Sequence, residues 1–576
     1  MMRQRFVITA LLALGLSVTG GALAQSDAEE PETAAPSDTE RGLQRRPGVE
    51  TERPALPEFE GLEDVPLELP NAEALDLPQD RLSTAPLLTL QRVRVNESTV
   101  LDPEEVGQLS ARYLDRQVSA QELQNLRAEL TGLYVERGYV TSGVLLPDQR
   151  VTDGTVNFQA VEGTLSEVEV RTSGRLRPSY VERRLALADG PLNVADLRDD
   201  LRTLHSDPLI ERLDSRLLPG SRRGEARLVI DVQEARPYQA SITAHNNRAP
   251  SVGSEWVELN LVHRNLLGFG DRAQLGYGTA DGLDDIFLSY AVPVFGGATL
   301  AASYTDSEAQ VVEEPFSRID IRSESQELAL DLVYPWRRFG NAMVTFTATV
   351  DHRESQTSLL GIPFSFSPGV QDGRAEVTAL RLTADWTDRR ANQVLALRGR
   401  VSVGIDALDA TANEGDIPDG EFVSLLAQAQ WARRFESSDH QLILRADLQK
   451  TLDGLLPLEK FSIGGRNSVR GYRQNLMVRD NGWVASAEYR IPAFRDVNGR
   501  SQFQWTVFAD AGRGWNETFA TPDPKSIASV GAGFLWEPLR GLRTEFYLAH
   551  GFEDVNFSDE DPQDRGIHLL LRYEFF

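Results

Sequence analysis

The chain has 576 residues, no cysteine and a formal net charge of −27. Its length allows several domains, and the lack of cysteine excludes disulfide bonds and thiolate metal sites. The acidic charge argues against nucleic acid as a partner, because proteins neutralise phosphate backbones with basic side chains.

The first 24 residues have the parts of a secretory signal peptide. Arg3 and Arg5 supply positive charge, residues 6–18 are apolar, and residues 22–24 (Ala-Leu-Ala) form a cleavage site. A membrane anchor is the alternative, but the apolar stretch is short of the ~20 residues that a spanning helix needs. Because no later segment approaches that length, we expect an exported chain that could enter a membrane only as a barrel.

Residues 25–86 are expected to form an acidic, proline-rich linker. From Ser26 to Pro86 there are 16 acidic residues, five basic residues and nine prolines, so the net charge of this stretch is 5 − 16 = −11. Such a composition buries too little apolar surface to fold. A weak helix at 39–46 is the one element that we expect could form there.

Residues 87–163 predict a small domain with the order β-α-α-β-β. Asp102 suits the cap of a first helix, and Ser119 with Glu122 has the spacing of a capping box for a second helix. The strands are expected at 88–95, 139–146 and 155–161. Residues 164–236 repeat this order, with strands around 168–170 and at 228–232 and helices at 178–187 and 194–204.

From residue 237 to 576 the apolar period becomes two, which is typical of strands. In Gln393–Ile405, Leu395 and Leu397 fall on one face and Arg398 and Arg400 on the other. Segments 423–434 and 440–449 alternate in the same way. A soluble sandwich would also alternate, but strands of ~10 residues suit tilted membrane strands.

The connections between these strands alternate between short and long. The short ones are expected at 265–271, 293–297, 335–341, 388–392, 436–439, 493–500 and 538–541, and the long ones at 306–323, 353–373, 406–420, 453–482, 513–525 and 553–565. Outer-membrane barrels have short periplasmic turns and longer outer loops, and they have even strand numbers. We therefore expect an all-β transmembrane barrel of about sixteen antiparallel strands.

Two motifs lie within this barrel region. Residues 468–472 read Ser-Val-Arg-Gly-Tyr in a long connection, and residues 508–512 read Phe-Ala-Asp-Ala-Gly on a strand. The strand's parity places Asp510 on the lumen face, where a partly desolvated carboxylate needs a partner, and Arg470 could meet it with a two-pronged hydrogen bond. On spacing alone, a solvated arginine that never contacts Asp510 is the favoured alternative.

These motifs and the two upstream units resemble two-partner secretion transporters of the haemolysin secretion/activation family, in the superfamily of outer-membrane barrels with periplasmic POTRA domains. Residues 136–139 (Glu-Arg-Gly-Tyr) and 161–163 (Val-Glu-Gly) resemble the first POTRA domain of that family. The resemblance implies a Gram-negative outer-membrane location and export of a large exoprotein that is unfolded in the periplasm. It also implies a loop that docks inside the barrel through Val469, Arg470, Gly471, Tyr472, Phe508, Asp510 and Gly512.

Two further sets of residues are candidate contacts with partners. The segment with Val140, Val144, Leu145 and Leu146 corresponds to an edge strand in POTRA folds, where an unfolded client could add as a strand; a covered edge is the alternative. The aromatic end of the chain, Tyr573, Phe575 and Phe576, resembles the signal read by the barrel-assembly machinery; packing against outer-membrane lipid explains it equally. Tyr472 could pack on the lumen wall or be an ordinary loop aromatic.

No enzyme signature is present in the sequence, so we expect no catalytic residues. Residues 268–270 (Gly-Phe-Gly) and 531–533 (Gly-Ala-Gly) lack the third glycine of a dinucleotide loop. The seven histidines show no ligand spacing, so neither a cofactor nor a metal is expected. The alternatives to exoprotein export are a barrel-protein insertion factor of the same superfamily and a passive porin-like channel.

Overall fold

A computed structural model describes residues 83–575 except 152, 186–189, 206, 340–341, 496–500, 556 and 558–559, together with residues 56, 59 and 67–69. The expected signal peptide, the weak helix at 39–46 and Phe576 lie outside the described residues. Within these described ranges, no helix combines the length and the apolar character needed to cross a membrane.

The first α+β unit has the expected helices and a divided sheet. Its elements are β2 (Pro86–Leu90), β3 (Arg92–Asn96), α3 (Pro103–Ser110), η3 (Ala111–Tyr113), β4 (Arg116–Ser119), α4 (Ala120–Glu136), β5 (Gly143–Leu145) and β6 (Thr155–Val161). Asp102 caps α3, and Ser119 and Glu122 form the predicted capping box of α4. The single strand expected at 88–95 is wrong, because the chain breaks at Gln91: β2 pairs with β4, whereas β3 joins β6 and β5.

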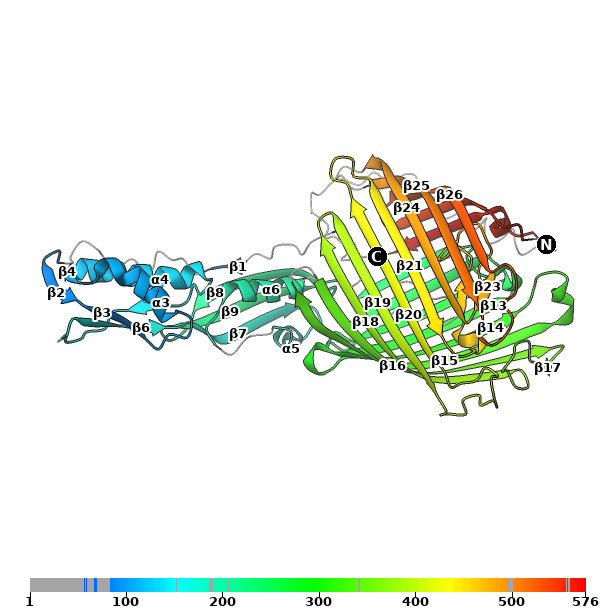
Figure 1. The fold of residues 1–576 in the computed structure, drawn as a ribbon, viewed down its shortest axis with the longest axis horizontal. Helices are drawn as coiled ribbons and strands as arrows, with labels where there is room; N and C mark the ends of the chain where they lie inside the picture. Colours follow the sequence, from blue (N-terminus) through cyan, green and yellow to red (C-terminus); the bar gives the residue numbers. More distant parts are fainter. Residues whose placement is uncertain are drawn as a thin grey trace. The chain divides into compact units, whose positions relative to one another are not determined.

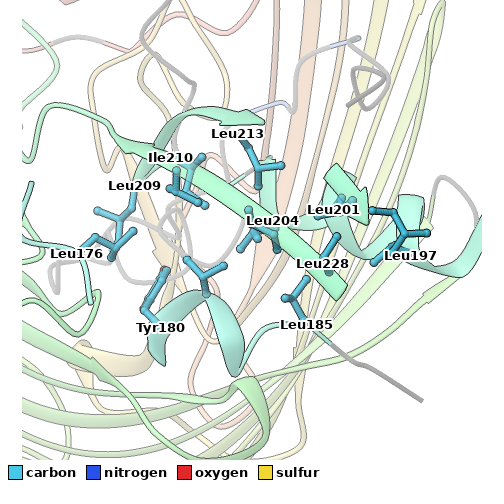
Figure 2. Close-up of a cluster of buried hydrophobic side chains, with 14 of the residues drawn as sticks. Leu176, Tyr180, Leu185, Leu197, Leu201, Leu204, Leu209, Ile210, Leu213 and Leu228 are labelled. Carbon is cyan, nitrogen blue, oxygen red and sulfur yellow. The ribbon is translucent and has the colours of Figure 1, made fainter. Parts of the chain in front are cut away.

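The second α+β unit builds its core under one sheet. Its elements are β7 (Thr164–Ser173), α5 (Pro178–Glu182), α6 (Val194–His205), β8 (Ile210–Pro219) and β9 (Glu225–Glu234). Figure 2 shows Leu201 and Leu204 of α6 facing Leu213 of β8 and Leu228 of β9, and all four are buried. A linker segment, β1 (Leu67–Glu68), runs parallel to β8 at the sheet edge, so the linker is not without structure at these two residues.

The remaining chain closes into the predicted barrel of sixteen long antiparallel strands (Figure 1). The strands are β10 (Tyr238–His245), β11 (Trp256–Arg264), β12 (Arg272–Ala280), β13 (Leu283–Pro293), β14 (Thr299–Gln310), β15 (Ile321–Phe339), β16 (Ala342–Leu359), β18 (Arg374–Arg390), β19 (Gln393–Ile405), β20 (Val423–Arg434), β21 (Gln441–Thr451), β24 (Asn481–Arg495), β25 (Ser501–Trp515), β26 (Ser526–Leu539), β27 (Leu542–Gly551) and β28 (Ile567–Glu574). The first strand, β10, pairs with the last strand, β28, which closes the barrel; the short β17 (Ile362–Pro363) lies beside β16.

Short and long connections segregate to opposite barrel ends, as predicted. One end has turns such as 391–392 and 540–541, and the other has loops such as 360–373 and 406–422, with the two-residue turn 281–282 as an exception. The alternation of faces also matches: on β15, Leu328, Leu330 and Trp336 are exposed on the outside, whereas Asp331 and Val333 are buried on the lumen side. The barrel therefore has an apolar exterior and a polar interior.

Candidate functional site: a loop anchored inside the barrel

Residues 452–480, which join β21 to β24, fold back into the barrel; we call this segment the lumen loop. It is more regular than the sequence predicts, because β22 (Phe461–Ile463) pairs with β23 (Met477–Arg479). Its apolar side chains share one buried cluster with lumen-facing wall residues of β20, β24 and β26. That cluster contains Leu426, Phe461, Ile463, Val469, Tyr472, Met477, Val484 and Ile527.

Arg470 and Asp510 meet, as the family resemblance implies. The Arg470 Nε donates to Asp510 Oδ2 at 2.8 Å and Nη2 donates to Oδ1 at 2.9 Å, while the Arg470 backbone N–H donates to Oδ2 at 3.2 Å. Nη1 donates to Glu488 Oε2 at 2.8 Å, so the guanidinium lies between two carboxylates. All three side chains are buried, a setting in which each charge depends on its partner.

The register of β24 against β25 arranges the wall side of this site. Asp510 pairs with Ser486 and Phe508 pairs with Glu488, so the four side chains form one patch on the lumen face. The guanidinium carbon of Arg470 lies 3.4 Å from the centroid of the Phe508 ring, a cation–π contact that adds to the ion pair. Sequence parity placed Phe508 and Asp510 inward, but Glu488 was missed.

The glycines of both motifs permit this close approach. Gly471 has φ +91°, a conformation that favours glycine, and a Cβ there would lie 3.0 Å from the Ala549 Cβ on the wall. A Cβ on Gly512 would lie 2.7 Å from the Cγ2 of Ile463 in the lumen loop. Each glycine therefore lets the loop and the wall pack without an intervening side chain.

Tyr472 packs within the lumen rather than projecting freely. Its hydroxyl donates to the Ala528 carbonyl oxygen on β26 at 2.9 Å and accepts from the Glu553 backbone N–H at 2.9 Å. The preceding Gly471 N–H donates to His568 Nε2 on β28 at 3.1 Å. The tip of the lumen loop therefore contacts the wall from β24 round to β28.

The tip also reaches the seam where β10 meets β28. The Gln474 backbone N–H donates to Gln563 Oε1 at 2.7 Å, and Gln563 Nε2 donates to the carbonyl oxygens of Asn246 and Arg248, each at 2.7 Å. Gln563 is completely buried and was not anticipated from sequence. One neutral side chain thus joins the lumen loop, the outer end of β10 and the turn before β28.

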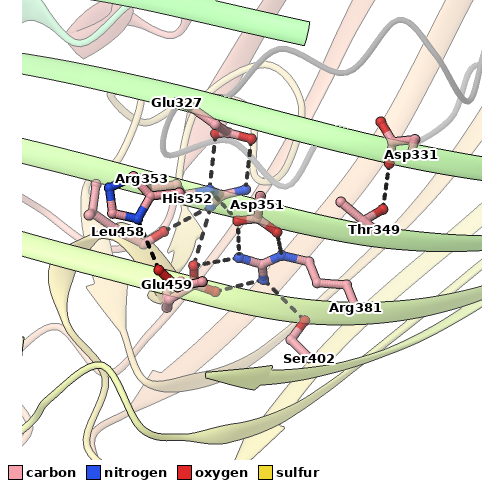
Figure 3. A network of polar contacts seen from close by, with 11 residues as sticks. Glu327, Asp331, Thr349, Asp351, His352, Arg353, Arg381, Ser402, Leu458 and Glu459 are labelled. Carbon is pink, nitrogen blue, oxygen red and sulfur yellow. Dashed lines mark hydrogen bonds and ion pairs between the residues drawn. The ribbon is translucent and has the colours of Figure 1, made fainter. Parts of the chain in front are cut away.

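A second polar cluster holds the base of the lumen loop to another part of the wall. Glu459, in the short 3₁₀ turn η7 (Pro457–Glu459), contacts Arg381 of β18 and Arg353 of β16. Figure 3 shows Arg381 between Glu459 and Asp351, with Glu327 beside Arg353. Sequence reasoning missed this cluster.

In the first POTRA-like unit, the segment proposed to bind client lies at a sheet edge, but Val144 itself is buried in the core. Among the described strands, β5 pairs only with β6, and its other edge faces α4. There the Val144 N–H donates to Thr131 Oγ1 at 3.0 Å, and Arg127 Nη1 donates to the Val144 carbonyl oxygen at 3.5 Å. Of the other candidates, Leu145 ends β5, whereas Val140 and Leu146 lie outside it.

At the end of the chain, the candidate assembly residues are on the outer surface. Tyr573 and Phe575 are exposed on the outward face and contact each other edge to face, with ring centroids 5.0 Å apart. This placement suits both lipid contact and recognition during assembly.

A closed barrel with an apolar exterior, a loop anchored in its lumen and two α+β units upstream defines an outer-membrane POTRA-barrel protein. The chain belongs to the haemolysin secretion/activation protein family (ShlB/FhaC/HecB), whose family model matches residues 224–535, more than half of the chain. A POTRA domain of the ShlB type matches residues 88–163. The protein is therefore an outer-membrane transporter of two-partner secretion, with its POTRA domains in the periplasm.

Related proteins agree with this assignment. The chain is similar to the outer membrane transporter CdiB of Dickeya dadantii (strain 3937), with 23% identity over 483 residues that cover 81% of this chain and 83% of that protein. It is also similar to the hemolysin transporter protein ShlB of Serratia marcescens, with 23% identity over 426 residues, covering 71% and 72% of the two chains.

Two solved structures share the fold. CdiB from Escherichia coli has a TM-score of 0.64 at 18% identity, covering 86% of this chain and 94% of that chain. BamA from Haemophilus ducreyi lacking POTRA domains 1–3 has a TM-score of 0.53 at 14% identity, covering 85% and 100%.

Proposed function

We propose that the lumen loop controls the passage of a large exoprotein, which reaches the periplasm unfolded and folds outside the cell. Two parallel hydrogen bonds join the buried guanidinium of Arg470 to the carboxylate of Asp510, and we call this ion pair the fork. The fork is the main support for the proposal, because it holds the loop where an extended polypeptide would have to pass. The protein catalyses no reaction in this scheme. Progressive folding of the client outside supplies the drive.

The physical basis is the cost of separating buried charges. Removing one partner of a buried ion pair costs about 3–5 kcal/mol, because the other charge stays desolvated. A loop held by such a pair remains in the lumen until a client binds the open state better than the closed one. In this scheme the loop therefore stays in the lumen while no client is bound.

The two alternatives weighed from the sequence have less support. The matched family is one of secretion transporters, which disfavours a general barrel-insertion factor. A lumen occupied by an anchored loop suits gated passage and disfavours passive diffusion.

The remaining partners are proposals as well. Outer-membrane lipid would cover the apolar exterior, and the barrel-assembly machinery would read the strand that ends with Tyr573 and Phe575. Client capture on the edge of β5 would require a client strand to replace the bonds from Thr131 and Arg127 to Val144. The POTRA boundaries at 87–163 and 164–236 and the linker at 25–86 remain proposals from the sequence.

The test removes each half of the fork. We expect Arg470→Ala and Asp510→Ala each to leave the amount of assembled barrel unchanged and to lower export of the cognate exoprotein at least tenfold. The double variant should lose no more than either single one, because the two groups act as a unit. Culture supernatant and outer-membrane fractions, probed by immunoblot, measure both quantities.

A matched control is Arg565→Ala, which removes a guanidinium from an exposed ion pair with Glu560. Exposed pairs contribute about 0–1 kcal/mol, so this variant should export normally. Normal export by both fork variants would remove the proposed role of the lumen loop.

A further inference from the structure

The lumen loop has two anchors on separate parts of the wall. The tip anchor joins Arg470 to β24 and β25, and the base anchor joins Glu459 to β16 and β18; strands β19, β20 and β21 lie between these two parts of the wall. At the base, Arg381 Nη1 and Nη2 donate to the two oxygens of Glu459 at 2.9 and 2.7 Å. Both side chains are buried, so this contact is screened little by salt.

The wall side of the base anchor is paired without the loop. Arg381 also forms a bidentate ion pair with Asp351, in which Nε and Nη2 donate to the two carboxylate oxygens at 2.5 and 2.8 Å (Figure 3). Arg353 Nε lies 3.0 Å from Glu327 and 3.1 Å from Asp351. If Glu459 leaves, two arginines remain in contact with two carboxylates, and no buried charge is left alone.

The tip anchor differs in this respect. Among the described residues, every hydrogen bond to the Asp510 carboxylate comes from Arg470. If Arg470 is withdrawn, Glu488 still has ion pairs with Arg490 Nε at 2.6 Å and Arg445 Nη1 at 3.4 Å. Asp510 loses its hydrogen-bond donor. Releasing the tip therefore leaves an unpaired buried carboxylate, whereas releasing the base does not.

The apolar contacts differ in the same direction. At the base, Leu455 and Leu456 pack against Val377, Ala379 and Phe422. The cluster that includes the tip takes five buried apolar residues from the lumen loop, which are Val469 and Tyr472 together with Phe461, Ile463 and Met477 of the β22–β23 pair. Withdrawal of the tip exposes more apolar surface, so hydrophobic burial adds to the difference in charge pairing.

We propose that Glu459 is the releasable anchor of the lumen loop, so that the base leaves the β16–β18 wall before the tip leaves Asp510. This rests on the proposed function, because it divides the opening of the same loop into two steps. Glu459 is a positioning residue in this scheme. The first step frees the lumen beside Arg381 and Arg353 while Arg470 still fixes the tip.

The absence of cysteine allows each step to be measured separately. Leu456→Cys reports on the base and Val469→Cys on the tip, because both side chains are fully buried in the closed state. In full-length protein in detergent, a thiol-reactive maleimide should label either cysteine slowly. Adding Glu459→Gln, which keeps the shape and removes the charge, should raise labelling at position 456 at least fivefold and leave position 469 unchanged.

Matched variants keep this result interpretable. Glu517→Gln makes the same change in an exposed pair with Lys450 and should alter neither rate. Glu459→Asp restores the charge and should return part of the protection at position 456. Arg470→Ala should raise labelling at position 469. Unfolding of the barrel would label both cysteines in every background, and unchanged labelling at position 456 in the Glu459→Gln background would overturn the proposal.

A bilayer measurement separates this inference from the proposed function. Glu459→Gln should open the reconstituted channel several-fold more often than Glu517→Gln does, with no client present. If export is normal in Arg470→Ala, the proposed gating role fails. If export is lost in Arg470→Ala but Glu459→Gln changes neither labelling nor opening, only the order of release fails.

Discussion

At the residue scale, the site rests on one arginine shared between carboxylates. Arg470 satisfies Asp510 with three hydrogen bonds and still reaches Glu488. A lysine could not reproduce this, because its ammonium is a compact point charge without a planar fork. The glycines beside both charged residues matter for the same reason, since they set how closely the loop approaches the wall.

Gly512→Ala tests that approach. The added Cβ would lie 2.7 Å from Ile463 Cγ2 and 3.1 Å from Val469 Cγ2, so we expect the lumen loop to shift away from β25. Both contacts are branched, fully buried side chains that cannot turn aside cheaply. Trypsin should then cleave at Arg466 and Arg473 faster than in the unaltered protein in detergent, as mass spectrometry can show.

The control for this change is Gly399→Ala on β19, where nothing lies within 4 Å of the added Cβ. It should leave the cleavage pattern as it is. Equal cleavage in the two variants would contradict close packing between the Gly512 wall and the lumen loop.

The Val-Glu-Gly motif of the first POTRA domain has a role that pH can test. Glu162 accepts hydrogen bonds from the N–H groups of Thr99 and Val100 at 2.6 and 3.0 Å and from the Tyr134 hydroxyl at 3.0 Å. Burial alone would raise the pKa of Glu162, but these hydrogen bonds outweigh it and hold the pKa below its ordinary value. The charged carboxylate therefore stabilises the folded domain.

The sign of the pH dependence follows from this lowered pKa. The stabilisation is fully present above the ordinary pKa of a glutamate, about 4.3, and is lost as the pH falls through the lower folded value. We expect Glu162→Gln to speed hydrogen exchange at the Thr99 and Val100 amides near neutral pH. The difference from the unaltered protein should shrink in acid, with the Val156 amide in β6 as an internal reference. A difference that persisted unchanged in strong acid would contradict a charge-dependent role.

Residue-level prediction from sequence succeeded only where a motif supplied both partners. Arg470 and Asp510 follow from two motifs and a family resemblance. Glu459, Glu488 and Gln563 do not, because strand parity assigns a face and does not choose among partners across a lumen. The chain has 86 acidic residues, so a lumen-facing acid alone singles out no contact.

At the element scale, the sequence predicts strand bounds well where one face of the strand contacts lipid, because apolar and polar residues must then alternate. β19 and β20 have the predicted bounds, because apolar residues on one face alternate with polar ones along the whole strand. β15 and β16 are longer than expected. Beyond Val350, both faces of β16 are polar (Asp351, His352, Arg353, Glu354), so the sequence reads as a loop although the ladder with β15 continues.

The seam between the first and last strands depends on a side chain. The ladder between β10 and β28 has five residue pairs, from Ser241–Glu574 to His245–Leu570. Beyond it, Asn246 Nδ2 donates to the Ile567 carbonyl oxygen at 2.8 Å, and Asn246 Oδ1 accepts from the Leu569 N–H at 2.8 Å. The Asn246 backbone N–H also donates to the Leu569 carbonyl oxygen at 3.2 Å, so the side-chain amide of Asn246 reinforces a backbone contact beyond the ladder.

We expect Asn246→Ala to weaken the outer end of this seam by about 1–3 kcal/mol, the cost of leaving buried polar groups without partners. Hydrogen exchange at the Leu569 amide should accelerate accordingly. Asn392→Ala removes an amide whose Nδ2 bonds the exposed Glu436 at 2.9 Å in a short turn, and it should leave Leu569 unaffected. Unchanged exchange at Leu569 in Asn246→Ala would show that backbone pairing alone closes the seam.

At the scale of the whole molecule, the period of two predicted a barrel and its two unlike ends, but not what fills the lumen. The alternation of apolar and polar residues predicts the wall strands but gives no information about the position of a loop. A usable signal did exist: Leu455, Leu456, Phe461 and Ile463 are apolar residues in what would otherwise be a solvated outer loop. Such residues need burial, and the lumen is the nearest place that offers it.

The outward face of a barrel strand shows which solvent, lipid or water, surrounds each part of that strand. On the outward face of β15, Leu328, Leu330 and Trp336 are exposed apolar residues. Gln326 lies on the same face, toward the long-loop end of the strand, and its cross-strand neighbours are Asp306 on β14 and Glu354 on β16. Lipid should surround the first group and water the second. Arginine introduced at the two places on one strand therefore meets different solvents.

We expect Leu330→Arg to destabilise the barrel in phospholipid vesicles by about 2–4 kcal/mol, the range for arginine near the bilayer midplane. Gln326→Arg, four residues along the same face, should cost about 0–1 kcal/mol, as near an interface. Urea titration of the refolded, vesicle-bound protein gives both free energies. A water-exposed strand would accept arginine equally at either place, so equal costs would contradict a lipid-facing exterior.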